Sequence, residues 1–264
     1  MTAKVAVAAG GRTFELEYAF LSAERADAPL MVFLHEGLGS LAMWRDFPQR
    51  LCDALGWRGL VYSREGYGRS TPRPAGERWP VTFMHRQADD VLPAFLRAVD
   101  VDAERDPPWL LGHSDGGSIA LLHAARYPAA VRGLVVLAPH IFVEDISLSS
   151  IAKARETYRT TDLKAKLARY HDDPDSAFGG WNDVWLDAAF AKWNIEERLP
   201  QIRCPVLAIQ GVDDEYGTMA QLDGIARAVP RARLLKLERC GHSPHKDRPE
   251  DVVAAVREFV AADP

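Results

Sequence analysis

Residues 109–126, WLLGHSDGGSIALLHAAR, contain a short apolar run, a Gly-x-Ser-x-Gly motif and a helix-favouring segment, in that order. Gly112 and Gly116 permit a sharp strand-to-helix turn with close passage of neighbouring backbone. Such a turn presents Ser114 at the carboxyl end of the strand, beside a helix N-terminus whose dipole favours developing negative charge. The segment therefore predicts a nucleophilic serine at the edge of a parallel sheet.

Other short apolar runs predict the rest of that sheet. A run at 4–8 is followed by one at 12–20 that alternates apolar and polar residues, as half-exposed antiparallel strands do. Nearly continuous runs of Val, Leu and Ile, typical of parallel strands buried on both faces, follow at 30–35, 59–63, 109–112, 133–138 and 205–211, with a weaker run at 233–238. Helical patterns separate them at 46–55, 85–99, 117–126, 220–229 and 250–260. We therefore predict an α/β fold, with a mostly parallel eight-stranded sheet flanked by helices.

The segment around Ser114 resembles the nucleophile elbow of the α/β-hydrolase family, whose members order their catalytic residues as Ser, acid, His. A second stretch, YSREGYGRSTP at 62–72, resembles the family's loop after the fourth strand. That loop is a positioning element in the family, and we assign it no catalytic role. The resemblance covers about residues 25–140 and 200–262.

The resemblance also implies where the acid and the base lie. The acid usually stands three residues beyond the glycine that ends a late strand, here Gly211, which selects Asp214 and leaves Asp213 as the alternative. The base belongs to a Gly-His pair after the last strand, which is His242. We expect His245 to lie on the surface or at a helix entrance.

The oxyanion hole is implied by two backbone segments. The third strand runs into His35, Glu36 and Gly37, where the family commonly has His-Gly followed by a residue whose amide contributes to the hole. Gly37 would be one donor and Asp115, directly after the nucleophile, the other. Glu36 departs from the family pattern, which leaves the register of the first donor open. Loss of one such donor costs on the order of 100- to 1,000-fold in rate.

Residues 141–200 show no clear strand pattern. A structureless loop of that length is uncommon in a compact domain, so we expect a helical cap inserted after the sixth strand. The chain then divides into a hydrolase core, residues 1–140 and 201–264, and a cap, residues 141–200.

Several side chains are candidates for a substrate pocket. We expect the cap tryptophans either to close over the serine or to pack the cap's own small core. The candidates are Trp181, Trp185 and Trp193, with His140 and Glu36 from the core.

The composition excludes some partners. A net charge of −5, with 47% hydrophobic and 26% charged residues, gives no reason to expect nucleic acid or an anionic membrane. No stretch resembles a signal peptide or approaches the roughly 20 apolar residues of a membrane span, so a cytoplasmic location is the default expectation. Cys52, Cys204 and Cys240 have no paired spacing and predict neither a disulfide framework nor a thiolate metal site. The oligomeric state stays open, a homo-oligomer included.

Together these residues predict hydrolysis of a small-molecule carboxylic ester through an acyl-enzyme. A serine hydroxyl becomes nucleophilic when an imidazole takes its proton, and a carboxylate fixes the imidazole tautomer. The triad and water suffice, so no metal or organic cofactor is implied. Carbon–carbon hydrolases of aromatic breakdown and haloperoxidase-like enzymes share the triad, although the former often have an aromatic residue where this chain has Ser243. A ligand-binding receptor of the same fold is the alternative outside the enzymes.

Asp115 has two interpretations. The Ser-Asp-Gly-Gly pattern is similar to that of biphenyl-hydrolase-like enzymes, in which the aspartate meets the ammonium group of an amino-acid ester. That resemblance implies a substrate with a nearby positive charge. Alternatively, Asp115 turns inward and bonds backbone amides or an arginine.

Overall fold

The computed structural model describes residues 2–262 and contains one eight-stranded sheet. Its strand order is β1-β2-β4-β3-β5-β6-β7-β8. The first two strands run antiparallel to their neighbours and the remaining strands pair in parallel, which confirms the predicted fold class. The strands are β1 (Ala3–Ala9), β2 (Arg12–Leu21), β3 (Leu30–Leu34), β4 (Arg58–Tyr62), β5 (Trp109–His113), β6 (Gly133–Leu137), β7 (Val206–Gly211) and β8 (Ala232–Leu237).

The continuous apolar runs form the centre of this sheet. Every residue of β3, β5, β6 and β7 is buried, whereas β2 alternates buried and more exposed positions along its first half. The strand order reverses direction around β3, which lies between β4 and β5. In open α/β sheets, ligands bind outside the carboxyl ends of the strands near such a reversal. This edge of the sheet is therefore the expected place for a site.

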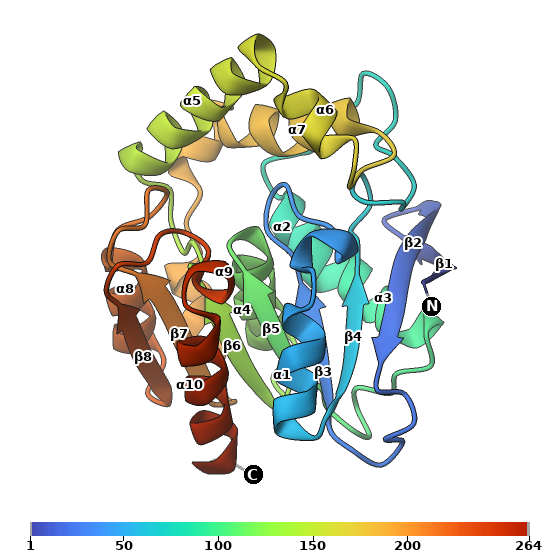
Figure 1. Cartoon of the computed structure of the whole chain (residues 1–264), viewed down its shortest axis with the longest axis vertical. Helices are drawn as coiled ribbons and strands as arrows, with labels where there is room; N and C mark the ends of the chain where they lie inside the picture. The colour runs from blue at the N-terminus through green and yellow to red at the C-terminus, as the bar shows by residue number, and fades with distance from the viewer. Residues whose placement is uncertain (1, 263–264) are drawn as a thin grey trace.

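Helices cover both faces of the sheet (Figure 1). The helices α1 (Phe47–Leu55) and α10 (Pro249–Ala262) pack against one face, through a cluster that includes Leu51 and Val256. The opposite face is covered by α2 (Phe83–Arg86), the π-helical turn η2 (Gln87–Val91), α3 (Leu92–Ala98), α4 (Asp115–Arg126) and α8 (Ala220–Ala228). The short elements η1 (Leu41–Trp44) and α9 (Pro244–Asp247) lie in loops near the carboxyl edge.

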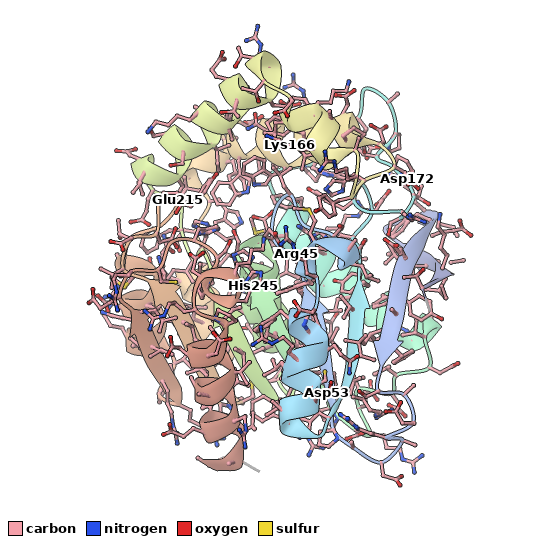
Figure 2. The ribbon with its side chains drawn as sticks, viewed as in Figure 1. Arg45, Asp53, Lys166, Asp172, Glu215 and His245 are labelled. Carbon is pink, nitrogen blue, oxygen red and sulfur yellow. The ribbon has the colours of Figure 1, made fainter. Side chains whose placement is uncertain are left out.

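A helical layer lies over the carboxyl edge, between β6 and β7 in sequence (Figure 1). It comprises α5 (Asp145–Thr160), α6 (Leu163–Leu167), α7 (Pro174–Trp185) and η3 (Phe190–Lys192), after which η4 (Glu196–Gln201) packs against the core helices α4 and α8. The helix α7 begins at Pro174. Asp173, the residue before it, caps the helix, because its side chain accepts a hydrogen bond from the Ser176 amide at 2.8 Å. Glu215 lies where this layer meets the core (Figure 2).

No helix within residues 2–262 is both long enough and apolar enough to cross a membrane.

Candidate active site

Ser114 lies at the turn between β5 and α4. Its backbone has φ +53° and ψ −120°, a strained conformation that non-glycine residues rarely adopt and that is held by the surrounding structure. Ser114 is 6% exposed, at the carboxyl edge of the sheet. The turn also needs Gly116, because a Cβ there would overlap the Leu34 carbonyl of the neighbouring strand.

The structure brings Ser114, His242 and Asp214 into one hydrogen-bonded row. His242 Nε2 lies 2.9 Å from Ser114 Oγ, and His242 Nδ1 lies 2.9 Å from Asp214 Oδ1 and 3.1 Å from Oδ2. The loop that carries His242 is held by hydrogen bonds to its backbone on both sides. His113 Nε2 donates to the His242 carbonyl at 2.7 Å, and the Glu215 carboxylate accepts from the His242 amide at 3.2 Å.

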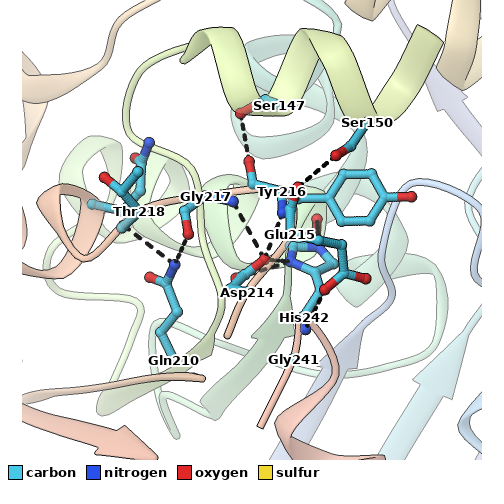
Figure 3. Close-up of polar contacts among 12 residues, drawn as sticks. Ser147, Ser150, Gln210, Asp214, Glu215, Tyr216, Gly217, Thr218, Gly241 and His242 are labelled. Carbon is cyan, nitrogen blue, oxygen red and sulfur yellow. Dashed lines mark hydrogen bonds and ion pairs between the residues drawn. The ribbon is translucent and has the colours of Figure 1, made fainter. Parts of the chain in front are cut away.

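The loop after β7 places the two candidate acids differently, and Figure 3 shows Asp214 beside His242. Asp214 is 7% exposed and accepts hydrogen bonds from the Tyr216 amide at 2.8 Å and the Gly217 amide at 3.3 Å. Burial works to raise the pKa of Asp214, but the contacts with His242 and the Tyr216 amide outweigh it and hold that pKa below its usual value. Asp213 is exposed, and its backbone amide donates to the Cys240 carbonyl at 3.0 Å. The geometry therefore favours Asp214 over Asp213.

A cavity of about 190 Å³ opens beside Ser114. The predicted pocket residues Glu36, His140, Trp181 and Trp185 line it, together with Gly37. Gly37 lies directly against the Trp181 indole of the helical layer, so closely that a Cβ at this position would overlap the ring. Gly37, one predicted oxyanion donor, thus borders the space next to the serine hydroxyl, and Asp115, the other, directly follows Ser114 in the chain.

The chain matches the model of the alpha/beta hydrolase family over residues 31–256. This chain belongs to that family. It is 26% identical over 198 residues to the serine hydrolase BPHL of Homo sapiens, an alignment that spans 70% of this chain and 63% of that protein. It is 28% identical over 270 residues to a pimeloyl-[acyl-carrier protein] methyl ester esterase of Aromatoleum aromaticum, covering 88% of this chain and 98% of that one. An esterase from Thermogutta terrifontis has the same fold, with a TM-score of 0.71 at 19% identity over 99% of this chain and 98% of that chain.

In this α/β hydrolase, Asp115 turns inward. It is fully buried, accepts a hydrogen bond from Trp185 Nε1 at 3.1 Å, and lies 3.8 Å from the buried guanidinium of Arg64. Burial raises the pKa of Asp115, and the attraction of Arg64 opposes that rise. The second interpretation of Asp115, a bond to an arginine, agrees with this geometry.

Glu36 lines the cavity of the hydrolase and has one cationic neighbour, Lys246, whereas burial lowers the pKa of its other neighbour, His113. Its carboxylate lies 3.5 Å from His113 Nδ1 and 3.5 Å from Lys246 Nζ. Burial works to raise the pKa of Glu36, yet His113 and Lys246 hold it well below its usual value. The side chain therefore carries a negative charge close to Gly37, offset by Lys246.

Two histidines and one tryptophan remain among the residues that the sequence singled out. His140 lines the cavity, and burial lowers its pKa to about 3, so it stays neutral. Of the two positions expected for His245, the surface is wrong and the helix entrance agrees with the structure, because His245 is the second residue of α9. It is 3% exposed in α9, and its ring packs against Trp44 at 4.8 Å, because the short helix turns it inward. Trp193 does not line the cavity and stacks instead on Phe190 at 5.5 Å, on the core side of the cap.

Sequence reasoning missed several lining residues, among them Leu38, His113, Ile151, Glu215 and Tyr216. The Tyr216 ring lies 4.7 Å from the His242 ring, and its amide also bonds Asp214. Its position two residues after the acid is the signal that could have identified it. A larger hollow of about 730 Å³ lies between α3 and the β1–β2 hairpin, but none of the three candidate catalytic residues lines it. The candidate catalytic residues, and not the volume, therefore identify the smaller cavity as the candidate active site.

Proposed function

We propose that this α/β hydrolase cleaves small-molecule carboxylic esters, with Ser114 as nucleophile, His242 as general base and Asp214 as its orienting acid. The observation that carries the proposal is the unbroken row from Asp214 through His242 to Ser114, with contacts of 2.9 Å on each side of the imidazole. A carboxylate accepts, so Nδ1 carries the proton and Nε2 is free to accept the serine proton.

The reaction follows from that tautomer. Ser114 Oγ bonds to the ester carbonyl carbon while its proton passes to His242 Nε2. The Gly37 and Asp115 amides stabilise the resulting oxyanion, and the carbon–oxygen bond then breaks as His242 gives its proton to the leaving alkoxide. Water attacks the acyl-enzyme in the same way and releases the acid and Ser114.

The helical layer supplies the roof of the site. We assign residues 141–200 to a cap and residues 1–140 and 201–264 to the core. Two cap helices contribute Ile151, Trp181 and Trp185 to a cavity of only about 190 Å³, which supports a small acyl or alcohol group.

The test combines a fluorophosphonate probe with hydrolysis of p-nitrophenyl acetate. We expect the probe to label Ser114, identified by mass spectrometry of the labelled peptide, and the ester to be turned over. Ser114→Ala should remove labelling and turnover, on the order of a million-fold in kcat, and His242→Ala should lose a comparable amount because the triad acts as a unit. The melting temperature serves as the folding control.

Two results would contradict the proposal. Near-normal kcat in His242→Ala would show that another group is the base. Tight ligand binding by the wild type without labelling or turnover would favour a receptor.

A further inference from the structure

The peptide unit between Glu36 and Gly37 is held by its carbonyl. The Glu36 oxygen accepts hydrogen bonds from the Gly39 amide at 3.0 Å, from His35 Nδ1 at 2.7 Å and from Arg64 Nη2 at 2.8 Å. The carbonyl and the N–H of a trans peptide point in opposite directions. The groups that hold the Glu36 carbonyl therefore set the direction of the Gly37 N–H.

Arg64 also determines which nitrogen of His35 carries the proton. The Arg64 backbone amide donates to His35 Nε2 at 3.0 Å, so Nε2 is an acceptor and Nδ1 is the donor to the Glu36 carbonyl. Burial, together with the charge of Arg64, holds the pKa of His35 well below its usual value, which keeps the ring in this neutral tautomer. Arg64 thus acts on the Glu36 carbonyl both directly and through His35.

The same guanidinium reaches the second donor segment. Arg64 Nη2 lies 3.8 Å from Asp115 Oδ2, and Arg64 is only 1% exposed. Its position is further fixed by the Tyr67 ring, whose centroid lies 4.8 Å from the guanidinium carbon. A side chain that follows β4 therefore connects the segment after β3 with the first residue of α4.

We propose that Arg64 is a positioning residue of the oxyanion hole, which holds the Glu36–Gly37 peptide with its N–H directed toward the oxygen that forms on the substrate. This inference rests on the proposed function. A charge-assisted hydrogen bond to the carbonyl also polarises the peptide and strengthens its N–H as a donor. A preorganised donor needs no reorientation when charge develops in the transition state.

Arg64 could instead serve only as the counter-ion of buried Asp115. Removing one partner of a buried pair leaves an uncompensated charge and destabilises the fold, so Arg64→Met alone would be ambiguous. The informative comparison is Arg64→Met/Asp115→Asn against Asp115→Asn, because neither protein has the buried carboxylate and only one has the guanidinium on the Glu36 carbonyl.

The first readout is kcat against KM for p-nitrophenyl acetate. We expect the double variant to have a kcat about 10- to 100-fold below that of Asp115→Asn with little change in KM, since a donor that is retained but no longer held costs less than a lost one. The kcat of Arg64→Lys should lie between that of the double variant and that of Asp115→Asn, because an ammonium group offers a point charge without the planar fork of a guanidinium. Arg86→Met is the matched control. It removes a guanidinium that lies 3.2 Å from Glu65 in the same loop and contacts neither donor segment, so kcat should be retained.

The second readout compares the affinities of trifluoroacetophenone and acetophenone. Ser114 Oγ adds to the activated ketone, whose carbonyl becomes an oxyanion, whereas acetophenone binds without that addition. Loss of Arg64 should weaken only the trifluoroketone, by a factor similar to the loss in kcat. Equal kcat in the double variant and Asp115→Asn, or equal weakening of both ketones, would overturn the inference. A wild type that neither prefers the trifluoroketone nor hydrolyses the ester would contradict the proposed function itself.

Discussion

Asp214 and Asp213 are adjacent in sequence but differ in what their side chains can do. Asp214 is 7% exposed and bonds His242, whereas Asp213 is exposed at the turn. We expect Asp214→Asn to lower kcat on the order of 10,000-fold, because the amide cannot hold the imidazole in the required tautomer. Asp213→Asn is the matched control and should leave kcat nearly unchanged. Steady-state kinetics of both variants with p-nitrophenyl acetate test this, and the reverse order of losses would move the acid to Asp213.

Asp115 offers a second prediction at the residue scale. Its carboxylate is fully buried and does not line the cavity: Oδ1 accepts from Trp185, and Oδ2 lies 3.8 Å from Arg64 without a hydrogen bond, so we expect it not to contact a substrate ammonium group. Asp115→Asn should therefore lower kcat/KM equally for glycine p-nitrophenyl ester and for its N-acetyl analogue. A selective loss of about 2–5 kcal/mol for the free amino ester, the scale for a buried charged pair, would show that Asp115 does read substrate charge.

At the scale of elements, the three cap tryptophans separate into two groups. Trp181 and Trp185 line the cavity from α7, whereas Trp193 stacks on Phe190 after η3. We expect Trp181→Leu and Trp185→Leu to change the preference among p-nitrophenyl acetate, butyrate and hexanoate. Trp193→Leu should lower only the melting temperature, since truncation of a large buried aromatic costs about 3–5 kcal/mol at most. If the preference among acyl lengths did not change in either α7 variant, the two tryptophans would serve only in packing.

The π-helical turn η2 has a local cause that no periodicity pattern revealed. Pro93 lacks an N–H and crowds the carbonyl four residues before it, which is that of Asp89. The widened turn leaves two carbonyls free, and α4 satisfies both. His123 Nδ1 donates to the Ala88 carbonyl at 2.7 Å, and the Tyr127 hydroxyl donates to the Asp89 carbonyl at 2.7 Å. The segment of α4 and Tyr127, which follows Ser114, is thereby joined to the neighbouring helix.

At the scale of the whole molecule, buried histidines make stability depend on pH. Burial lowers the pKa of His123 from 6.5 to about 4, against the opposing bond to the Ala88 carbonyl. The unfolded chain takes up this proton at higher pH than the native state does. The stabilisation is therefore complete above pH 6.5 and is lost as the pH falls toward 4, on the order of 3 kcal/mol for this one group.

His123→Gln tests that dependence, because glutamine keeps an N–H donor but does not titrate. We expect the melting temperature of the variant to fall less steeply than that of the wild type between pH 6.5 and 4. His140 contributes in the same direction in both proteins, so only the difference between the curves is informative. Parallel curves would mean that His123 is protonated in the native state.

Local patterns in the sequence determined the fold class and the region of the site. The continuous apolar runs were typical of buried parallel strands, and the glycines around Ser114 permitted a sharp turn at a strand end. The family resemblance, applied to the residues after Gly211 and to the Gly-His pair, then selected Asp214 and His242, which the structure brings together, while their catalytic roles stay a proposal.

The tertiary structure alone decided which side chains share a contact across distant segments. The sheet order sets Arg64, after β4, beside segments that follow β3 and β5, and places Trp185 of the cap on Asp115. The alternatives left open for Trp193 and His245 were decided in the same way. Periodicity and turn chemistry indicate which helix, strand or turn a residue belongs to. Its contacts depend instead on how elements far apart in the chain pack, and that packing also decides which partners a buried charge has.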